Sequence, residues 1–350
     1  MENIEKTENT ENAEIKENPE KTEKLENTVN KEEPKNNEIK VIDKNFPSTD
    51  GIHQLKGKLY IPACEPKAIF HVVHGMIEHI GRYDAFLREM AENGYLVVAY
   101  DNLGHGYTAK DDSELGFIAK KKGWKKLTDD VYVVSIIVKG EYPGLPYYLM
   151  GHSMGSFIVR NAVSRYPDLA DKVIVMGTGG PMAATKAAID IITRNKLFHG
   201  ERHVSPFIEN LAFGQYNKGF GDGSNGDWLS KDPEVRRVYD QDKFCNYHFT
   251  SSAMLDLVKL NDIVNRKEWF KRMGKWNHPI LLVSGADDPV GNHGKGVKKV
   301  YKLLKKRKAN VQMKLYENNR HEILNDTARE EVIADINRFL DGEAFDLTWV

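Results

Sequence analysis

The sequence predicts an α/β protein with a mostly parallel central sheet, flanked by helices and carrying an inserted helical cap. Short runs that are apolar throughout alternate with amphipathic helical patterns, and strands that are apolar on both faces are typical of parallel sheets covered by helices. Between about residues 182 and 277 the strand-like runs stop and helical spacings take over, which indicates an insertion, the alternative being a helical tail of the core that packs elsewhere. The chain has 350 residues, 40% of them hydrophobic, which is enough for one large domain with such an insertion.

The first 40 residues lack the composition of a packed domain. They hold 12 Glu, 7 Lys and 8 Asn, with no aromatic residue and no glycine, so their local charge is −5. Such a segment buries too little apolar surface to fold. We therefore expect a disordered tail over 1–40, a first core part over 41–181, a helical cap over 182–277 and a second core part over 278–350.

Five apolar runs are the expected strands of the core. Apolar residues at helical spacing over 83–91 predict one crossover helix between the first two runs. Alternation over 311–315 predicts an outer strand, and helical spacing over 332–340 predicts a closing helix. The five runs cover residues 69–73, 95–100, 147–150, 173–176 and 280–283.

A serine motif, Gly151 to Gly155, directly follows the third of these runs, at a predicted strand-to-helix turn. Ser153 stands in Gly151-His152-Ser153-Met154-Gly155, and a tight turn of this kind needs small residues two positions on either side of the serine. The start of the following helix also places backbone N–H groups and a positive dipole end beside the hydroxyl. This context favours a nucleophile elbow with Ser153 as the nucleophile.

A serine hydroxyl is a poor nucleophile at neutral pH, so it needs a base and a group that orients the base. With this elbow the chain order is serine, acid, histidine. His321 follows the predicted outer strand, where a loop at the carboxyl edge of the sheet would bring it to the elbow. His293 is the other histidine late in the chain, but it lies too near the acid. We expect His321 to be the base, the alternative being a surface loop histidine.

The acid is expected at the end of the run 280–283, where two carboxylates compete. Pro289 restricts Asp288 to an extended conformation, which suits a side chain aimed along the top of the sheet. We therefore favour Asp288 over Asp287, which would then be a solvated turn residue or a loop cap.

An acyl-transfer site also needs N–H donors for the developing oxyanion. One is expected at Met154, directly after the nucleophile, and the other in the loop after the run 69–73. Gly75 permits a turn in that loop, so we expect the second donor to be the Met76 N–H.

The same loop contains possible metal ligands, His74, Glu78 and His79, but their spacing matches neither helical zinc motif. Cys64 and Cys245 are the chain's two cysteines, and they stand far apart in no metal-like spacing. We expect neither a metal nor a cofactor.

Five motifs in order resemble the monoacylglycerol lipase and lysophospholipase branch of the α/β-hydrolases, a serine aminopeptidase-type group. The resemblance spans residues 55–345 and implies Ser153 as nucleophile, Asp288 as acid, His321 as base and the Met76 and Met154 amides as oxyanion hole. It also implies a cap that forms an acyl-chain channel. The motifs are HGMIEHIGRY (74–83), YDNLGHG (100–106), GHSMG (151–155), GADD (285–288) and RHEILN (320–325).

The chain departs from that family at a few positions. Ser156 stands where the family usually has glycine, and Asn102 and Leu103 stand where it has a basic or polar pair. These positions concern packing and loop shape more than chemistry, so the departures bear on the choice of substrate.

The resemblance implies a serine carboxylic-ester hydrolase that acts through an acyl-enzyme on monoacylglycerol, lysophospholipid or a similar single-chain ester. An aminopeptidase or amidase with the same triad is the nearest alternative, in which Glu201 or Glu209 would bind a free N-terminus. A non-catalytic hydrolase fold that serves as a binding module, with the tail as its interaction arm, is a third.

The net charge of −1 gives no global field toward nucleic acid, so we expect no nucleic-acid partner. The absence of a signal peptide or apolar span predicts a cytoplasmic protein. The segment 295–308 predicts an amphipathic helix whose basic face is either simply solvated or in peripheral contact with an anionic membrane. Its basic residues are Lys295, Lys298, Lys299, Lys302, Lys305, Lys306, Arg307 and Lys308.

Overall fold

The computed structural model describes residues 38–221, 223 and 226–343. Almost all of the predicted tail, residues 1–37, lies outside this part, as do residues 344–350 of the predicted second core part. The division of the chain at 182 and 277 stays a prediction.

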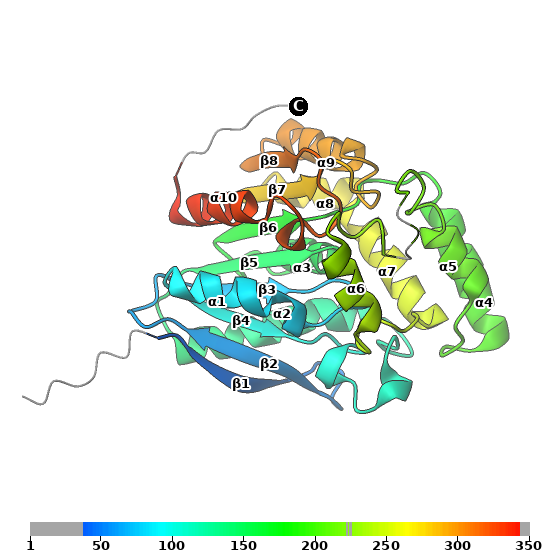
Figure 1. Ribbon diagram of the computed structural model, residues 1–350, viewed down its shortest axis with the longest axis horizontal. Coiled ribbons are helices and arrows are strands. Elements are labelled where there is room, and N and C mark those ends of the chain that lie inside the picture. Colours follow the sequence, from blue (N-terminus) through cyan, green and yellow to red (C-terminus); the bar gives the residue numbers. More distant parts are fainter. Residues whose placement is uncertain (1–37, 222, 224–225, 344–350) are drawn as a thin grey trace, which may run out of the picture. The chain divides into compact units, whose positions relative to one another are not determined.

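One sheet organises the described residues, and it confirms the predicted fold class (Figure 1). The strand order is β1-β2-β4-β3-β5-β6-β7-β8; β1 and β2 pair antiparallel with their neighbours, and all other pairs are parallel. The strands are β1 (Lys40–Pro47), β2 (Gln54–Ile61), β3 (Ala68–Val73), β4 (Tyr95–Tyr100), β5 (Tyr147–His152), β6 (Lys172–Met176), β7 (Ile280–Gly285) and β8 (Val311–Tyr316).

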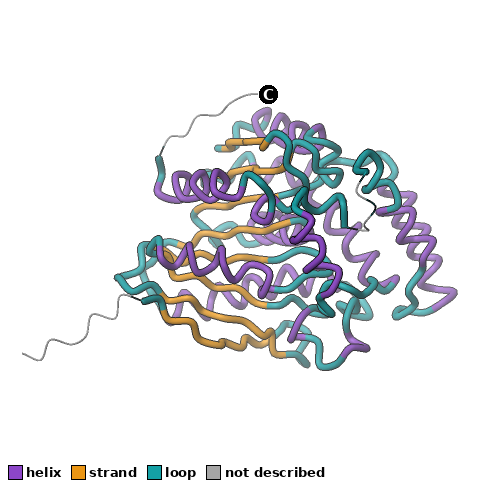
Figure 2. Tube along the Cα trace, in the orientation of Figure 1, coloured by secondary structure: helices purple, strands orange, loops and turns teal. Residues whose placement is uncertain are grey.

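Helices cover both faces of the sheet, as Figure 2 shows. Successive residues of a strand point to opposite faces, so Leu149 and Met150 belong to two different apolar clusters. Helices α1 and α10 contribute to the cluster that contains Met150, whereas α2, α3 and α9 contribute to the other. These helices are α1 (Asp84–Glu92), α2 (Gly123–Glu141), α3 (Met154–Arg165), α9 (Lys295–Lys306) and α10 (Arg329–Asp341), and short 3-10 helices cover Ile80–Tyr83, Gly106–Thr108, Asp112–Glu114 and Ile323–Asn325.

The described residues between β6 and β7 form helices and turns without a strand. Helix α7 packs against α2 and α3, so this helix belongs to the layer that covers the sheet. The helices of this segment are α4 (Thr185–His199), α5 (Pro206–Phe213), α6 (Pro233–Gln241), α7 (Ser251–Val264) and α8 (Lys267–Met273).

No helix within the described ranges combines the length and the apolar composition that crossing a bilayer requires. The cytoplasmic location expected from the sequence stays a prediction.

Candidate active site

Ser153 lies on a sharp turn between β5 and α3. Its φ of 53° is uncommon for a residue with a side chain, and its N–H donates to the Met176 carbonyl at 3.0 Å. A Cβ on Gly151 would lie 2.3 Å from the carbonyl oxygen of Gly155, and a Cβ on Gly155 would lie 2.1 Å from that of Val73. Both positions therefore require glycine, and the Ser153 side chain remains half-buried at the carboxyl end of the sheet.

The residues that depart from the family pattern have defined contacts around this turn. The Ser156 hydroxyl donates to the Ser153 carbonyl oxygen at 2.5 Å, so it supports the elbow. Asn102 donates from its backbone to His74 Nε2 at 2.8 Å and from its amide to the His74 carbonyl at 3.2 Å. Leu103 is buried in the core.

The loop after β3 passes directly against the nucleophile. A Cβ on Gly75 would lie 2.9 Å from Ser153 Cβ, so only glycine allows this approach. Met76 follows at once in the chain, and Met154 is the first residue of α3. Met154 thus follows Ser153 directly and the loop that contains Met76 passes against it, and their role as oxyanion donors stays a prediction.

Asp288 and His321 lie together in the interior, at the ends of β7 and β8. Asp288 Oδ1 lies 3.0 Å from His321 Nδ1, and the two side chains are 0% and 2% exposed. The carboxylate also accepts from the Ser284 hydroxyl at 3.0 Å and from the Val290 N–H at 2.8 Å. Burial alone would raise the pKa of Asp288, but the His321 charge and these hydrogen bonds hold it below its usual value.

The loop after β8 brings His321 to the end of the sheet where Ser153 lies. A Cβ on Gly177 would lie 3.0 Å from His321 Cε1, and Gly177 follows Met176, the residue that accepts from the Ser153 N–H. The three expected catalytic side chains thus follow the carboxyl ends of β5, β7 and β8, with β6 between the first two.

Asp287 and His293, the alternatives to Asp288 and His321, have more exposed side chains. The Asp287 side chain is 43% exposed and lies 4.0 Å from the Lys231 ammonium. The His293 side chain is exposed as well.

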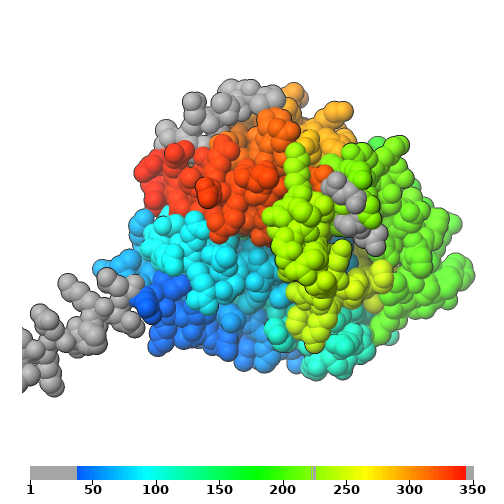
Figure 3. Space-filling model, viewed as in Figure 1, coloured from blue at the N-terminus to red at the C-terminus, as the bar shows by residue number. Residues whose placement is uncertain are grey.

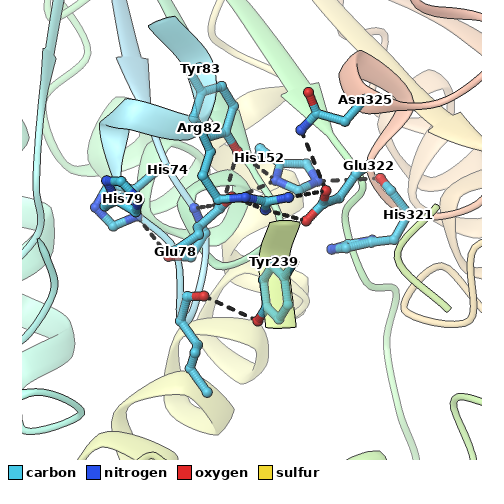
Figure 4. Close-up of polar contacts among 12 residues, drawn as sticks. His74, Glu78, His79, Arg82, Tyr83, His152, Tyr239, His321, Glu322 and Asn325 are labelled. Carbon is cyan, nitrogen blue, oxygen red and sulfur yellow. Dashed lines mark hydrogen bonds and ion pairs between the residues drawn. The ribbon is translucent and has the colours of Figure 1, made fainter. Parts of the chain in front are cut away.

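A buried charged network beneath the elbow was not predicted from the sequence (Figure 4). Glu78 Oε1 accepts from the Gly75 N–H and from the Tyr83 hydroxyl, and it lies 3.2 Å from His152 Nδ1. His152 Nδ1 lies 2.8 Å from the Tyr83 hydroxyl, while Nε2 lies 3.3 Å from the His321 carbonyl oxygen. A histidine that donates from both ring nitrogens is an imidazolium, so Glu78 and His152 form a buried ion pair.

An arginine extends this network to the loop of His321. Arg82 donates to both oxygens of Glu322, at 2.5 and 2.7 Å, and lies 3.4 Å from Glu78 Oε2. The loop after β3, the elbow and the loop after β8 are therefore joined by one set of buried charges.

Electrostatics keep this pair charged. Burial would raise the pKa of Glu78, but the hydrogen bond and charge of His152, together with Arg82, hold it well below its usual range. Burial would likewise lower the pKa of His152, yet the hydrogen bond and charge of Glu78 raise it. The only sequence signal for this pair was that each residue lies close to a predicted site residue: Glu78 in the loop of Met76, and His152 directly before Ser153.

Two of the possible metal ligands considered in the sequence analysis, His74 and Glu78, make hydrogen bonds to other residues. His74 accepts from the Asn102 N–H, as described above, and Glu78 pairs with His152. Within the described residues, His79, Asp242 and Cys245 do place possible ligand atoms within 4.8 Å of one another. The Gly81 N–H donates to His79 Nδ1 at 3.3 Å, so the proton of the neutral ring stands on Nε2, which lies 2.8 Å from Asp242 Oδ2. This arrangement is a hydrogen-bonded pair beside a buried thiol.

The sheet and its serine elbow define an α/β-hydrolase. A family model described as "Serine aminopeptidase, S33" (Hydrolase_4) matches residues 64–328, and the chain belongs to this family.

Several proteins are similar to the chain over most of its length. A solved structure of a highly thermostable carboxyl esterase from Bacillus coagulans, in complex with glycerol, superposes with a TM-score of 0.80 at 29% identity and covers 86% of this chain and 98% of that one. A monoglyceride lipase homolog of monkeypox virus is 25% identical over 297 residues, covering 81% of this chain and 92% of the relative. Human monoglyceride lipase is 26% identical over 271 residues, covering 74% and 77%.

Proposed function

We propose that the chain is a serine carboxylic-ester hydrolase that acts through an acyl-enzyme on monoacylglycerol, lysophospholipid or a similar single-chain ester. The observation that carries this proposal is the buried Asp288–His321 pair at the same end of the sheet as the Ser153 elbow. The similarity to monoglyceride lipases and to a carboxyl esterase supports the ester as the substrate class.

In the proposed mechanism, His321 takes the proton from Ser153 as the hydroxyl oxygen attacks the ester carbonyl carbon. The Met76 and Met154 N–H groups stabilise the oxyanion, each contributing roughly 3–4 kcal/mol to lowering the barrier. His321 then gives the proton to the departing alcohol, leaving an acyl group on Ser153. Water, deprotonated by the same imidazole, releases the fatty acid and restores the serine. Asp288 orients the ring and stabilises its cationic form.

The test is an acyl-chain series of nitrophenyl and glyceryl esters, measured with wild type and Ser153→Ala. We expect kcat/KM to fall at least about a thousandfold in the variant, and a fluorophosphonate probe to label only the wild type. Undiminished hydrolysis by Ser153→Ala would reject the proposal. A folded wild type that neither hydrolyses esters nor reacts with the probe would favour the binding-module alternative.

The family description keeps the aminopeptidase alternative in view. Its expected acidic groups are already engaged, because Glu201 lies 3.6 Å from Lys120 and Glu209 lies 2.8 Å from His248. Comparing turnover of esters and aminoacyl amides separates the two activities, and we expect the ester to be preferred.

We also propose peripheral contact with an anionic membrane through α9 and the residues that follow it, up to Lys308. Val297, Val300 and Leu304 of this helix face the core, which leaves most of its lysines exposed. A basic face of this kind is attracted to anionic lipid, where a single-chain ester would be found.

A further inference from the structure

The loop that carries Met76 contains a strained residue. Ile77 has φ of 54°, a left-handed conformation that is an outlier for a β-branched side chain. Its side chain is 9% exposed and packs in the core. Such a conformation persists only where the surroundings hold it in place.

A contact from α6 holds this residue. The Tyr239 hydroxyl donates to the Ile77 carbonyl oxygen at 3.1 Å, across 162 positions of the chain. The Tyr239 ring also faces the Arg82 guanidinium, whose Cζ lies 4.7 Å from the ring centroid. Figure 4 shows the hydroxyl pointing at the loop, and Figure 3 shows the yellow-green α6 segment lying across the cyan and orange-red segments that supply the site.

A second contact joins the end of α6 to the same loop. Asp242, the residue after α6, lies 2.8 Å from His79 Nε2 and also accepts from the Phe244 N–H at 2.8 Å. The loop is therefore fastened to α6 at Ile77 and again two residues later, at His79.

We infer that Tyr239 is a positioning residue for the oxyanion hole, which acts by holding Ile77 in its strained conformation and thereby keeping the Met76 N–H beside Ser153. Rotation about the N–Cα bond of Ile77 turns the chain before it relative to the chain after it. Relaxation of Ile77 to negative φ would therefore displace Met76. This inference rests on the proposed function, and it makes α6 a part of the catalytic geometry.

The experiment is a double-mutant cycle on kcat and KM with a glyceryl ester. Tyr239→Phe removes the hydroxyl and keeps the ring against Arg82, so we expect kcat to fall about tenfold while KM stays within about twofold. In an Ile77→Gly background a left-handed conformation carries no penalty, so adding Tyr239→Phe is expected to lower kcat by less than about twofold. Ile77→Asn, which tolerates the same φ, replaces Ile77→Gly if the glycine variant does not fold.

Tyr95→Phe is the matched control. It removes a hydroxyl bond to Asp341 of 2.7 Å at the start of β4, the end of the strand away from the site, and kcat should not change. Wild-type kcat in Tyr239→Phe would overturn the inference, and so would a full tenfold loss in the Ile77→Gly background. A wild type without Ser153-dependent turnover would reject the proposed function itself and the inference with it.

Discussion

At the scale of single residues, two neighbouring carboxylates lie in opposite environments. Asp288 is fully buried and accepts from Ser284 and Val290, whereas the Asp287 side chain is 43% exposed. A carboxylate can orient an imidazole only when its own position is fixed, and this condition holds for Asp288 alone.

Asp288→Asn should lower kcat/KM on a nitrophenyl ester by about 10³ to 10⁴, because an amide can hold His321 in the wrong tautomer and cannot stabilise its cation. Asp287→Asn is the matched control and should retain wild-type kcat/KM. Equal losses in the two variants would contradict the assignment of the acid.

The Glu78–His152 pair should make stability depend on pH in a defined direction. The pKa of Glu78 is depressed and that of His152 is raised, so the pair contributes fully above about pH 4.3 and below about pH 6.5. As pH rises through the raised pKa of His152, the imidazolium loses its proton and the contribution disappears.

We therefore expect His152→Gln to reduce the free energy of unfolding by about 3–5 kcal/mol near pH 6, since it leaves Glu78 without this partner. The difference from wild type should shrink toward pH 9. Chemical denaturation of both proteins from pH 5 to 9 measures it, and a difference that stays constant over that range would contradict the pairing.

Sequence reasoning at this scale proposed the residues that local context marks. Ser153 is marked by its glycines, and Asp288 by the strand before it and the proline after it. The ion pair could not be predicted in this way, because Glu78 and His152 are 74 positions apart and neither motif reveals its partner. Tyr239 was missed for the same reason.

At the scale of elements, the elbow depends on how closely β3 approaches α3. Gly155, the second residue of α3, lies against the Val73 carbonyl, whereas Gly140 of α2 is exposed with open space around it. Both are helical, so they differ in packing rather than in backbone conformation.

Gly155→Ala should therefore reduce the free energy of unfolding by about 1–3 kcal/mol or more, because its Cβ would meet backbone atoms. Gly140→Ala should increase it by about 0.5–1 kcal/mol, since alanine favours a helix. Thermal denaturation of both variants checks the pair, and a similar loss in each would contradict the packing argument.

The strands that the sequence predicted from unbroken apolar runs are those buried on both faces, and the edge strand β8 was predicted from its alternation. β4 and β7, for example, are buried at every position, which produces an unbroken apolar run. β1 and β2 were missed, because they lie toward one edge of the sheet and alternate polar with apolar residues. Apolar content alone cannot separate such strands from exposed loops.

At the scale of the whole molecule, membrane contact through the basic residues of α9 and contact through exposed apolar residues differ in their dependence on salt. Vesicles that contain anionic lipid should sediment with the protein at low salt and release it at high salt, because attraction to lysines is screened. A Lys299→Glu/Lys302→Glu/Lys306→Glu variant should remain in the supernatant. Leu197 and Phe198 of α4 are also exposed, at 78% and 83%, and binding that is insensitive to salt would point to them and contradict the role of α9.

The order of the strands also bears on synthesis of the protein. β5, which leads into Ser153, lies in the middle of the sheet, whereas β8, which leads into the loop of His321, is an edge strand and follows the other seven strands of the sheet in the described chain. A nascent chain would thus carry Ser153, the proposed nucleophile, long before it acquired His321, the proposed base. If the proposed function holds, we expect the chain to stay inert toward cellular esters until β8 docks on the sheet.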